Sequence, residues 1–443
     1  MNTNHAITPN TRRWALRMPC SMATFAISDS VYSSAGPSDH PFWLDSGPIA
    51  SAHGRFHHLG AAPSLWLSPE SADPRDLLRH GLAEMAGTRA TLPRPAARLV
   101  AAFDYDTGRH LDHCRVAPGA PVAEAALGLY PACVSYDYAG NGWVTAVSET
   151  AAAELMERLG TAVSEPPPAG LSALRAEHDA ESYGALVRRV QEAIRAGDVY
   201  QVNLSQRFDA VLSGPAWALY VALRRRRPAP WGAYLDLGPS AIVSNSPECL
   251  LDVDGELVRT WPLKGTRARR DGDEDVTLAE LLRSEKDAAE HVMIVDLLRN
   301  DLGRIAVPGS VRVTSLMHPA RHPTVVHLES TIEARPRPEC GLPELFAAVF
   351  PGGSITGAPK LAAIDLIAAL EGERRGIYCG ALGYVDADGV RSKWAIPIRT
   401  ATVDHASGRA RFRSGGGVVI DSDPAAEYEE TLVKARAFLE LAS

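Results

Sequence analysis

The clearest hydrophobic pattern in the chain begins near residue 180 and predicts an amphipathic helix. Apolar residues recur there at intervals of three and four, which is the spacing of one helical face. Gly197 follows the last of them, and glycine readily adopts the left-handed conformation that ends many helices. The apolar face consists of Tyr183, Leu186, Val187, Val190 and Ile194.

The period changes to two in the next segment, from Val199 to Phe208, and predicts a strand. One of its faces is apolar and the other is polar. A strand with a polar face forms either an exposed surface, which is the commoner case, or the wall of a polar pocket. The apolar face consists of Tyr200, Val202, Leu204 and Phe208, and the polar face of Gln201, Asn203 and Ser205.

Later patterns predict two more helices, a short strand and a β-meander. We expect helices over 284–300 and 358–370, a strand over 325–328, and meander strands over 378–385, 394–403 and 409–414. A glycine-rich loop over 351–357 leads into the second helix. It lacks the G-x-x-x-x-G-K-[ST] spacing of a phosphate-binding loop, so we exclude a nucleotide site there.

The C-terminal segment 413–434 has the features of a binding site. A strand leads into Gly415, Gly416 and Gly417, whose backbone N–H groups can approach an anion closely. A second short strand is expected over Val418 to Ile420. Asp423 then suits the N-cap of a final helix, since Pro424 suits its first position.

Two carboxylates and an amine share one face of that final helix. Glu427, Glu430 and Lys434 follow one another at i, i+3 and i+7. Neighbouring carboxylates repel each other unless a cation lies between them, and an all-oxygen site suits Mg²⁺. The alternative is a solvated acidic helix face after a glycine-rich hairpin, and the segment alone favours neither interpretation.

The first part of the chain gives weaker patterns, with strands expected near 42–46, 101–106 and 132–138. The proline-rich segment 164–170 is the clearest linker. We therefore expect an N-terminal region over 1–170 and a second region over 171–443 that carries the site. Residues 1–28 contain no acidic residue and resemble a transit peptide only loosely. We expect a disordered leader there, or a true start at Met22.

Composition restricts the partners and the compartment. The chain has 443 residues, 45 of them Lys or Arg and 53 Asp or Glu, so its net charge of −8 argues against nucleic acid as a partner. No apolar run approaches the roughly 20 residues of a membrane span. The six cysteines are scattered without a Cys-x-x-Cys pair, which indicates reduced thiols in a cytoplasmic protein.

Several motifs between about Glu181 and Lys434 together resemble the chorismate-utilising enzymes, a family that includes anthranilate, aminodeoxychorismate, isochorismate and salicylate synthases. The resemblance implies an α+β fold in which large antiparallel sheets pack together with helices outside. It also implies that 171–443 is the chorismate-binding domain. The motifs are Tyr200-Gln201-Val202-Asn203-Leu204, Ser246-Pro247-Glu248, Pro262-Leu263-Lys264-Gly265-Thr266, the run Lys286 to Gly303, Pro351 to Lys360, Ile398-Arg399-Thr400, Ser414 to Gly417 and Glu427 to Lys434.

The resemblance also implies roles for individual residues. Glu290, Glu427 and Glu430 correspond to a Mg²⁺ site, with Glu429 facing away. Glu248 corresponds to the acid that protonates the departing 4-hydroxyl of chorismate. His327 corresponds to a further catalytic residue that lines the ring pocket. Residues expected to hold the two substrate carboxylates are Arg399, Lys434, Gly415, Gly416 and Gly417, and the remaining substrate contacts are expected from Thr356, Gln201 and Thr266.

Two positions separate the branches of the family. The water-adding relatives have a lysine base where this chain has Gln201, and an amide cannot deprotonate water near neutral pH. Anthranilate synthases have alanine where this chain has Lys264, as aminodeoxychorismate synthases do. The resemblance therefore favours amination at carbon 4, with Lys264 as a covalent nucleophile. In the alternative interpretation, Lys264 is only the ion-pair partner of a pocket carboxylate.

The aminodeoxychorismate branch supplies para-aminobenzoate for folate, and its members take ammonia from a separate glutamine amidotransferase subunit. We expect such a partner here because the synthase motifs occupy the chain. The alternatives are anthranilate synthase component I, or an inactive subunit that binds chorismate or tryptophan. Relatives have a tryptophan pocket near the positions of Leu44-Asp45-Ser46 and Arg55-Phe56, where the match is faint. Pro397 is expected to interrupt the strand that carries Arg399.

Overall fold

The computed structural model describes residues 12–17, 39–47, 56–69, 73–90, 92, 95–111, 125–159, 167–268, 274–321 and 325–442. For residues 12–17, 266–268, 274–278, 286, 321 and 325 it describes the backbone alone. Most of the predicted leader over 1–28 lies outside the described residues. Its exception is Arg12–Arg17, which forms strand β1 and pairs with β8.

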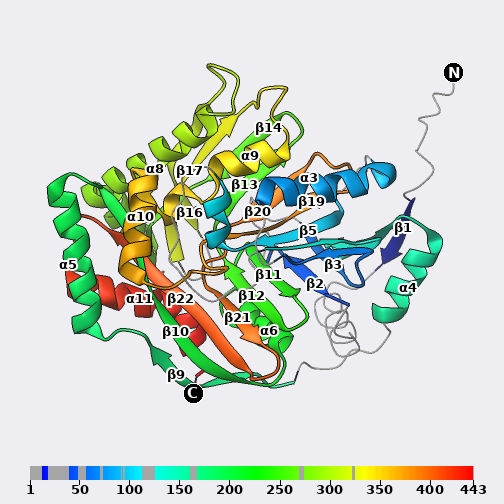
Figure 1. Cartoon of the computed structure of the whole chain (residues 1–443), viewed down its shortest axis with the longest axis horizontal. Coiled ribbons are helices and arrows are strands. Elements are labelled where there is room, and N and C mark those ends of the chain that lie inside the picture. The colour runs from blue at the N-terminus through cyan, green and yellow to red at the C-terminus, as the bar shows by residue number, and fades with distance from the viewer. Residues whose placement is uncertain are drawn as a thin grey trace.

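Two large antiparallel sheets form the body of the protein (Figure 1). In the described part of the chain the first sheet has 12 strands, and β9 (Gly170–Ala176) pairs with β10 off its main path. The order across the first sheet is β1, β8 (Asn141–Ala146), β7 (Ala132–Asp137), β3 (Phe56–Gly60), β2 (Phe42–Asp45), β11 (Trp231–Asp236), β12 (Ser240–Ser246), β21 (Thr400–Asp404), β22 (Arg409–Val418), β10 (Gln201–Ser213) and β18 (Gly357–Ala358).

The second sheet has 10 strands among the described residues, with β16 (Arg312–Arg321) pairing with β17 off the main path. Its order is β15 (Leu263–Ala268), β17 (Val325–Ala334), β14 (Leu257–Trp261), β13 (Cys249–Asp254), β20 (Ser392–Ala395), β19 (Ala381–Asp386), β5 (Ala97–Phe103), β6 (Ala125–Leu129) and β4 (Leu65–Leu67). Residues from both sides of the proline-rich linker contribute strands to both sheets.

Helices cover the outer faces of the sheets, so the predicted α+β class is confirmed (Figure 1). Helix α11 packs on β22 and α5, α10 packs on β10, and α8 packs on β15 and β17. The helices are α3 (Pro74–Met85), α4 (Glu149–Leu159), α5 (Ala180–Ala196), α6 (Ala216–Arg226), α7 (Glu274–Arg283), α8 (Glu285–Gly303), α9 (Leu342–Val349), α10 (Lys360–Glu371) and α11 (Pro424–Leu439), with 3₁₀ turns η1 (Ala86–Thr88), η2 (Tyr105–His110) and η3 (Gly353–Ile355).

Helix α5 follows the predicted pattern, and β10 does so in part, since it begins at Gln201 and leaves Tyr200 of the predicted apolar face 68% exposed outside the strand. Asp179 accepts a hydrogen bond from the Ser182 backbone at the start of α5, and Gly197 ends it with φ +84°. The polar face of β10 is buried, with Gln201 and Ser205 each 1% exposed. Of the two interpretations of that face, the wall of a polar interior is therefore correct.

The predicted strand over 394–403 is wrong, because the chain changes sheets within it. Strand β20 belongs to the second sheet and β21 to the first, and Pro397 lies between them. The predicted interruption at Pro397 is thus confirmed. Arg399 lies in this crossover rather than in a strand.

The predicted break at the three glycines is also wrong. Gly415, Gly416 and Gly417 lie inside the continuous strand β22 and pair with Ser205, Leu204 and Asn203 of β10. The following helix begins as predicted, since the side chain of Asp423 accepts a hydrogen bond from the Ala426 N–H at 2.8 Å.

Candidate active site

The site lies where two chain segments cross side by side from one sheet to the other. Strand β12 continues through Pro247 into β13, and β20 continues through Pro397 into β21. Since β12 pairs with β21 and β13 pairs with β20, the two crossovers run together. The Ser246 hydroxyl donates to the Ile396 carbonyl at 2.5 Å, and the Ile396 N–H donates to the Glu248 carbonyl at 3.0 Å.

Glu248 lies in the first crossover, and its carboxyl group is suited to act as an acid. It is 7% exposed, and burial raises its pKa from 4.5 to about 7. A hydrogen bond from the Ser354 hydroxyl at 2.5 Å and the charges of Lys434, Lys264 and Arg399 act in the opposite direction. A large fraction of this carboxyl group is therefore protonated near neutral pH.

Arg399 lies in the second crossover with an unusual backbone conformation. Its φ of +52° is in the left-handed region, which non-glycine residues seldom adopt. Burial and the charge of Arg227 lower the pKa of its guanidinium, while Glu248 acts in the opposite direction. Its guanidinium makes no hydrogen bond or ion pair with another described residue. Such a group can bind a carboxylate in a bidentate manner.

Lys264 lies on β15 of the second sheet. It approaches the part of β22 in the first sheet that contains Gly415, Gly416 and Gly417, here called the glycine strand. A methyl group on Gly417 would lie 3.0 Å from Lys264 Nζ and 2.6 Å from Gln201 Nε2. Gly417 therefore leaves the space that allows the amine and the amide to lie beside each other. Lys264 also forms an ion pair with Glu290 of α8, with 2.9 Å between Nζ and Oε2.

Gln201 presents a hydrogen-bond acceptor at the same place. Its side chain is 1% exposed, and Oε1 accepts no hydrogen bond within the described part of the chain. A buried amide oxygen without a donor is rare in folded proteins. This atom can therefore accept a hydrogen bond from a bound molecule.

Glu427 and Glu430 converge on the opposite side of the glycine strand. A methyl group on Gly416 would lie 3.2 Å from Glu427 Oε2 and 2.9 Å from Glu430 Oε1. Glu427 is 6% exposed and accepts a hydrogen bond from the Ser422 hydroxyl at 2.7 Å. Lys434 pairs with Glu430 at 2.6 Å and donates to the Gly415 carbonyl at 3.0 Å.

The two converging carboxylates fit a hard divalent cation. Their donor atoms are carboxylate oxygens, which Mg²⁺ prefers, and the absence of a side chain at Gly416 leaves room between them. Glu290 is paired with Lys264 instead, and no group of three or more His, Cys, Asp or Glu side chains in the described ranges is placed to hold a metal ion. Glu429 is exposed, as predicted.

The other predicted substrate contacts, His327, Thr266 and Thr356, lie on β17, on β15 and in the glycine-rich loop. His327 is 4% exposed on β17, opposite Thr266 of β15 in the strand register. The side chain of Thr266 is outside the described part of the chain. Thr356 is fully buried, and its hydroxyl donates within its own loop to the carbonyls of Gly352 and Gly353.

Sequence reasoning missed Ser354, although it makes the shortest contact to the predicted acid. It lies in the glycine-rich loop, in which only Thr356 was predicted as a substrate contact. Its spacing from Glu248 in the sequence, 106 residues, gives no sign of this contact.

Two general predictions can be checked in the described part of the chain. Cys133, Cys249, Cys340 and Cys379 are free thiols there, whereas Cys20 and Cys114 lie outside it. Within the same residues no helix is long and apolar enough to cross a membrane.

The positions near which relatives have a tryptophan pocket are partly described. Leu44, Asp45, Ser46 and Phe56 line a cavity between the sheets, and Arg55 lies outside the described residues.

Comparison with known proteins identifies the family. The sequence profile described as chorismate binding enzyme matches residues 49–440. The chain is 38% identical over 432 residues to anthranilate synthase component 1 of Streptomyces coelicolor, covering 91% of this chain and 84% of that protein. It is 36% identical over 426 residues to aminodeoxychorismate synthase component 1 of Klebsiella aerogenes, covering 89% of this chain and 92% of that protein.

A solved structure agrees with these sequence matches. Anthranilate synthase component I from Streptococcus pneumoniae is 28% identical to this chain and superposes with a TM-score of 0.74, covering 88% of this chain and 93% of that one. The profile match includes every segment that forms the site, from Gln201 to Lys434. The chain therefore belongs to the family of chorismate-binding enzymes.

Proposed function

We propose that this enzyme is component I of an aminodeoxychorismate synthase, which replaces the 4-hydroxyl of chorismate by an amino group. The observation that carries the proposal is the position of Lys264, whose amine lies beside Gln201 at Gly417 and whose charge acts on the buried Glu248. An amine and a protonated acid at one site suit the substitution of a hydroxyl group.

Cationic side chains bind the two carboxylates of chorismate in this proposal. The guanidinium of Arg399 is available to one of them. Lys434 can contribute to the other, together with the backbone of the glycine strand on which its amine lies. These contacts orient the ring between Lys264 and Glu248.

The first chemical step is a substitution in which both ring double bonds migrate. The neutral amine of Lys264 forms a bond to carbon 2, and the bond between carbon 4 and its hydroxyl breaks. Glu248 donates the proton that allows the hydroxyl to leave as water. This step produces a covalent adduct between Lys264 and the substrate.

The second step reverses the first with a different nucleophile. Ammonia forms a bond to carbon 4, both double bonds migrate back, and the amine of Lys264 leaves carbon 2. The ammonium group formed on carbon 4 returns a proton to Glu248. The unused acceptor Oε1 of Gln201 is suited to hold an N–H of ammonia. The product, 4-amino-4-deoxychorismate, retains its pyruvyl ether and can supply para-aminobenzoate for folate.

The ion pair between Lys264 and Glu290 sets a condition on this mechanism. An amine that is held by a carboxylate at 2.9 Å is not available to attack carbon 2, so the pair must open during turnover. Glu290, Glu427 and Glu430 are the residues that would hold Mg²⁺. When bound, the ion would neutralise a carboxylate of the substrate.

Ammonia would come from a separate glutamine amidotransferase subunit. The Klebsiella aerogenes relative is named component 1, which supports a second component in that enzyme. We extend this arrangement to the present chain.

Anthranilate synthase component I is the second candidate. The relative from Streptomyces coelicolor carries that name at similar identity. The observed ion pair with Glu290 also matches the interpretation in which Lys264 has only an electrostatic role. Anthranilate synthesis would place the amino group on carbon 2 and release pyruvate.

The acid role of Glu248 predicts a specific pH dependence. Because burial raises its pKa to about 7, the protonated form is present below that pH and is lost as the pH rises. Relative to Glu248→Gln, which needs the neutral amine of Lys264 equally, we expect the wild-type kcat/KM for chorismate to fall about tenfold per pH unit above about pH 7, with the concentration of neutral ammonia held constant. Glu248→Gln should remove this limb and about 100-fold or more of the activity. A wild-type profile with the same shape as that of Glu248→Gln up to pH 9 would contradict the acid role.

The metal assignment predicts different effects for neighbouring glutamates. Glu290→Gln, Glu427→Gln and Glu430→Gln should each weaken Mg²⁺ binding on the order of 100-fold in calorimetric titrations and abolish turnover, with the fold intact by circular dichroism. Glu429→Gln is the matched control and should behave like the wild type. An inactive Glu429→Gln together with an active Glu430→Gln would show that the helix face is wrongly assigned.

The proposed partner predicts how nitrogen is used. We expect the isolated chain to aminate chorismate with ammonium salts and not with glutamine, and to use glutamine once a glutaminase subunit is added. Strong turnover with glutamine by this chain alone would rule out the need for a separate subunit.

The covalent role predicts an adduct on Lys264. Intact-protein mass spectrometry of the wild type after an acid quench should show a substrate-sized mass increase that maps to this residue. Lys264→Ala should still bind chorismate, since both carboxylate contacts remain, but should turn over slowly and shift toward anthranilate. A wild-type enzyme that releases anthranilate and pyruvate without an adduct would favour the second candidate.

A further inference from the structure

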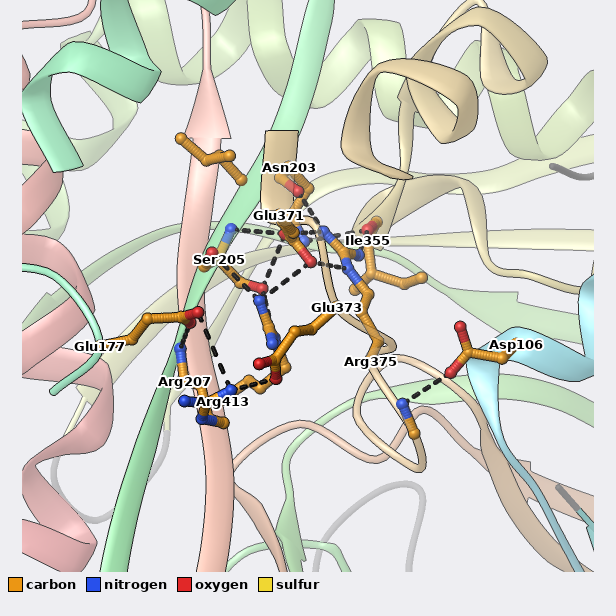
Figure 2. A network of polar contacts seen from close by, with 12 residues as sticks. Asp106, Glu177, Asn203, Ser205, Arg207, Ile355, Glu371, Glu373, Arg375 and Arg413 are labelled. Carbon is orange, nitrogen blue, oxygen red and sulfur yellow. Dashed lines mark hydrogen bonds and ion pairs between the residues drawn. The ribbon is translucent and has the colours of Figure 1, made fainter. Parts of the chain in front are cut away.

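A buried polar network lies behind the site, centred on Glu371 at the end of α10 (Figure 2). The carboxylate of Glu371 is 6% exposed and accepts hydrogen bonds from the N–H and hydroxyl of Ser205, both at 2.8 Å. Arg375 donates to the same carboxylate from Nε at 2.9 Å and from a terminal nitrogen at 2.7 Å. The mechanism proposed above uses neither Glu371 nor Arg375.

Arg375 connects this carboxylate to the glycine-rich loop. Its two terminal nitrogens donate to the carbonyls of Ile355 at 3.0 Å and Asn203 at 2.6 Å. The Asn203 side chain donates to the same Ile355 carbonyl at 3.0 Å, and the Asn203 backbone N–H donates to the Thr356 carbonyl at 2.8 Å. The backbone at Ile355 and Thr356 is thus fixed from the β10 side by a fully buried guanidinium.

The residue before this anchored pair is Ser354, the hydrogen-bond donor to Glu248. Its hydroxyl lies 2.5 Å from Glu248 Oε1. A displacement of the Ile355 carbonyl would therefore move the Ser354 side chain directly. Ser354 is therefore the residue that connects the network to Glu248, the acid of the proposed mechanism.

The same carboxylate also holds the strand that carries the glycines. Arg413 of β22 donates to Glu371 Oε2 at 3.2 Å and to the Ser205 hydroxyl at 3.1 Å. Gly415 follows it by two residues. Glu371 thereby ties the loop of Ser354 and the glycine strand to one fixed point.

We propose that Glu371 and Arg375 are positioning residues that hold Ser354 against Glu248 and so keep the acid in its working orientation. This inference rests on the proposed function, because it concerns the acid of that mechanism. A buried pair of ions is a weak source of net stability, whereas a guanidinium that bonds three separate groups fixes their relative positions.

The groups around Glu248 make the effect on its titration specific. Lys434 on α11, Lys264 on β15 and Arg399 in the crossover face it as charges, and Ser354 donates a hydrogen bond to it. That bond stabilises the ionised carboxylate. Its loss should raise the pKa of Glu248 and move the alkaline limb of kcat/KM upward by about one unit, since hydrogen bonds to charged groups contribute about 1.5–3 kcal/mol and one unit is about 1.4 kcal/mol.

The test is a double-mutant cycle on the pH profile. Ser354→Ala should raise the alkaline limb by about one unit. Arg375→Ala should raise it in the same direction, and adding Arg375→Ala to Ser354→Ala should produce no further shift. Arg375→Lys keeps the charge but lacks the planar fork, so we expect a shift between those of the wild type and Arg375→Ala. If Arg375→Ala does not fold, Arg375→Lys in both backgrounds carries the same test.

Arg391→Ala provides a matched control. Arg391 pairs with the buried Asp386 at 3.2 Å in the β19–β20 turn, at the far end of β20 from Arg399. Arg391→Ala should lower the melting temperature, as we also expect of the Arg375 variants, while leaving the alkaline limb at the same pH as in the wild type.

Two results would overturn the inference while leaving the proposed function intact. The first is an alkaline limb of Arg375→Ala or Arg375→Lys that lies at the same pH as the alkaline limb of the wild type. The other is a shift by Arg375→Ala that persists in full in the Ser354→Ala background. Failure of the proposed function has a different signature, since the wild type would then release anthranilate and pyruvate and carry no adduct on Lys264.

Discussion

The paired crossover between the two sheets is the constraint on which the site depends. Each crossover contains a proline, and each carries one reactive or binding side chain, Glu248 or Arg399. Because the Ser246 hydroxyl and the Ile396 backbone bond the two crossovers together, the acid and the guanidinium cannot move independently. The sheets on either side then deliver Lys264 from the second sheet and the glycine strand from the first. A shift of one sheet against the other would separate the Lys264 amine from Gln201 and Gly417.

Burial determines the protonation of the acid in this arrangement. Glu248 lies near three cations that favour its ionised form, yet desolvation has the larger effect and keeps the carboxyl group partly protonated near neutral pH. The glycines have a complementary effect on the other groups. Gly417 admits the Lys264 amine beside Gln201, whereas Gly416 admits the carboxylates of Glu427 and Glu430 on the opposite side of the strand. One strand without side chains therefore gives space to Lys264 and Gln201 on one face and to Glu427 and Glu430 on the other.

Local features of the chain were predictable from the sequence because they depend on nearby residues. The helix that ends at Gly197 and the helix that begins after Asp423 follow from spacing and capping groups. The sheet change at Pro397 was only partly predictable, since proline indicates a break but not the sheet to which the next strand belongs. An ion pair of Lys264 with a pocket carboxylate was one of the two interpretations of that residue. Its partner Glu290 and the contact from Ser354 could not be predicted, because each joins segments whose distance is set by tertiary packing.

The central claim is that this chain aminates chorismate at carbon 4, and product identification tests it most directly. Purified protein would be incubated with chorismate, Mg²⁺ and an ammonium salt labelled with ¹⁵N, and the products would be separated and identified by mass and by NMR. The account predicts 4-amino-4-deoxychorismate with the label on carbon 4 and no release of pyruvate. Labelled anthranilate formed together with an equal amount of pyruvate would contradict it.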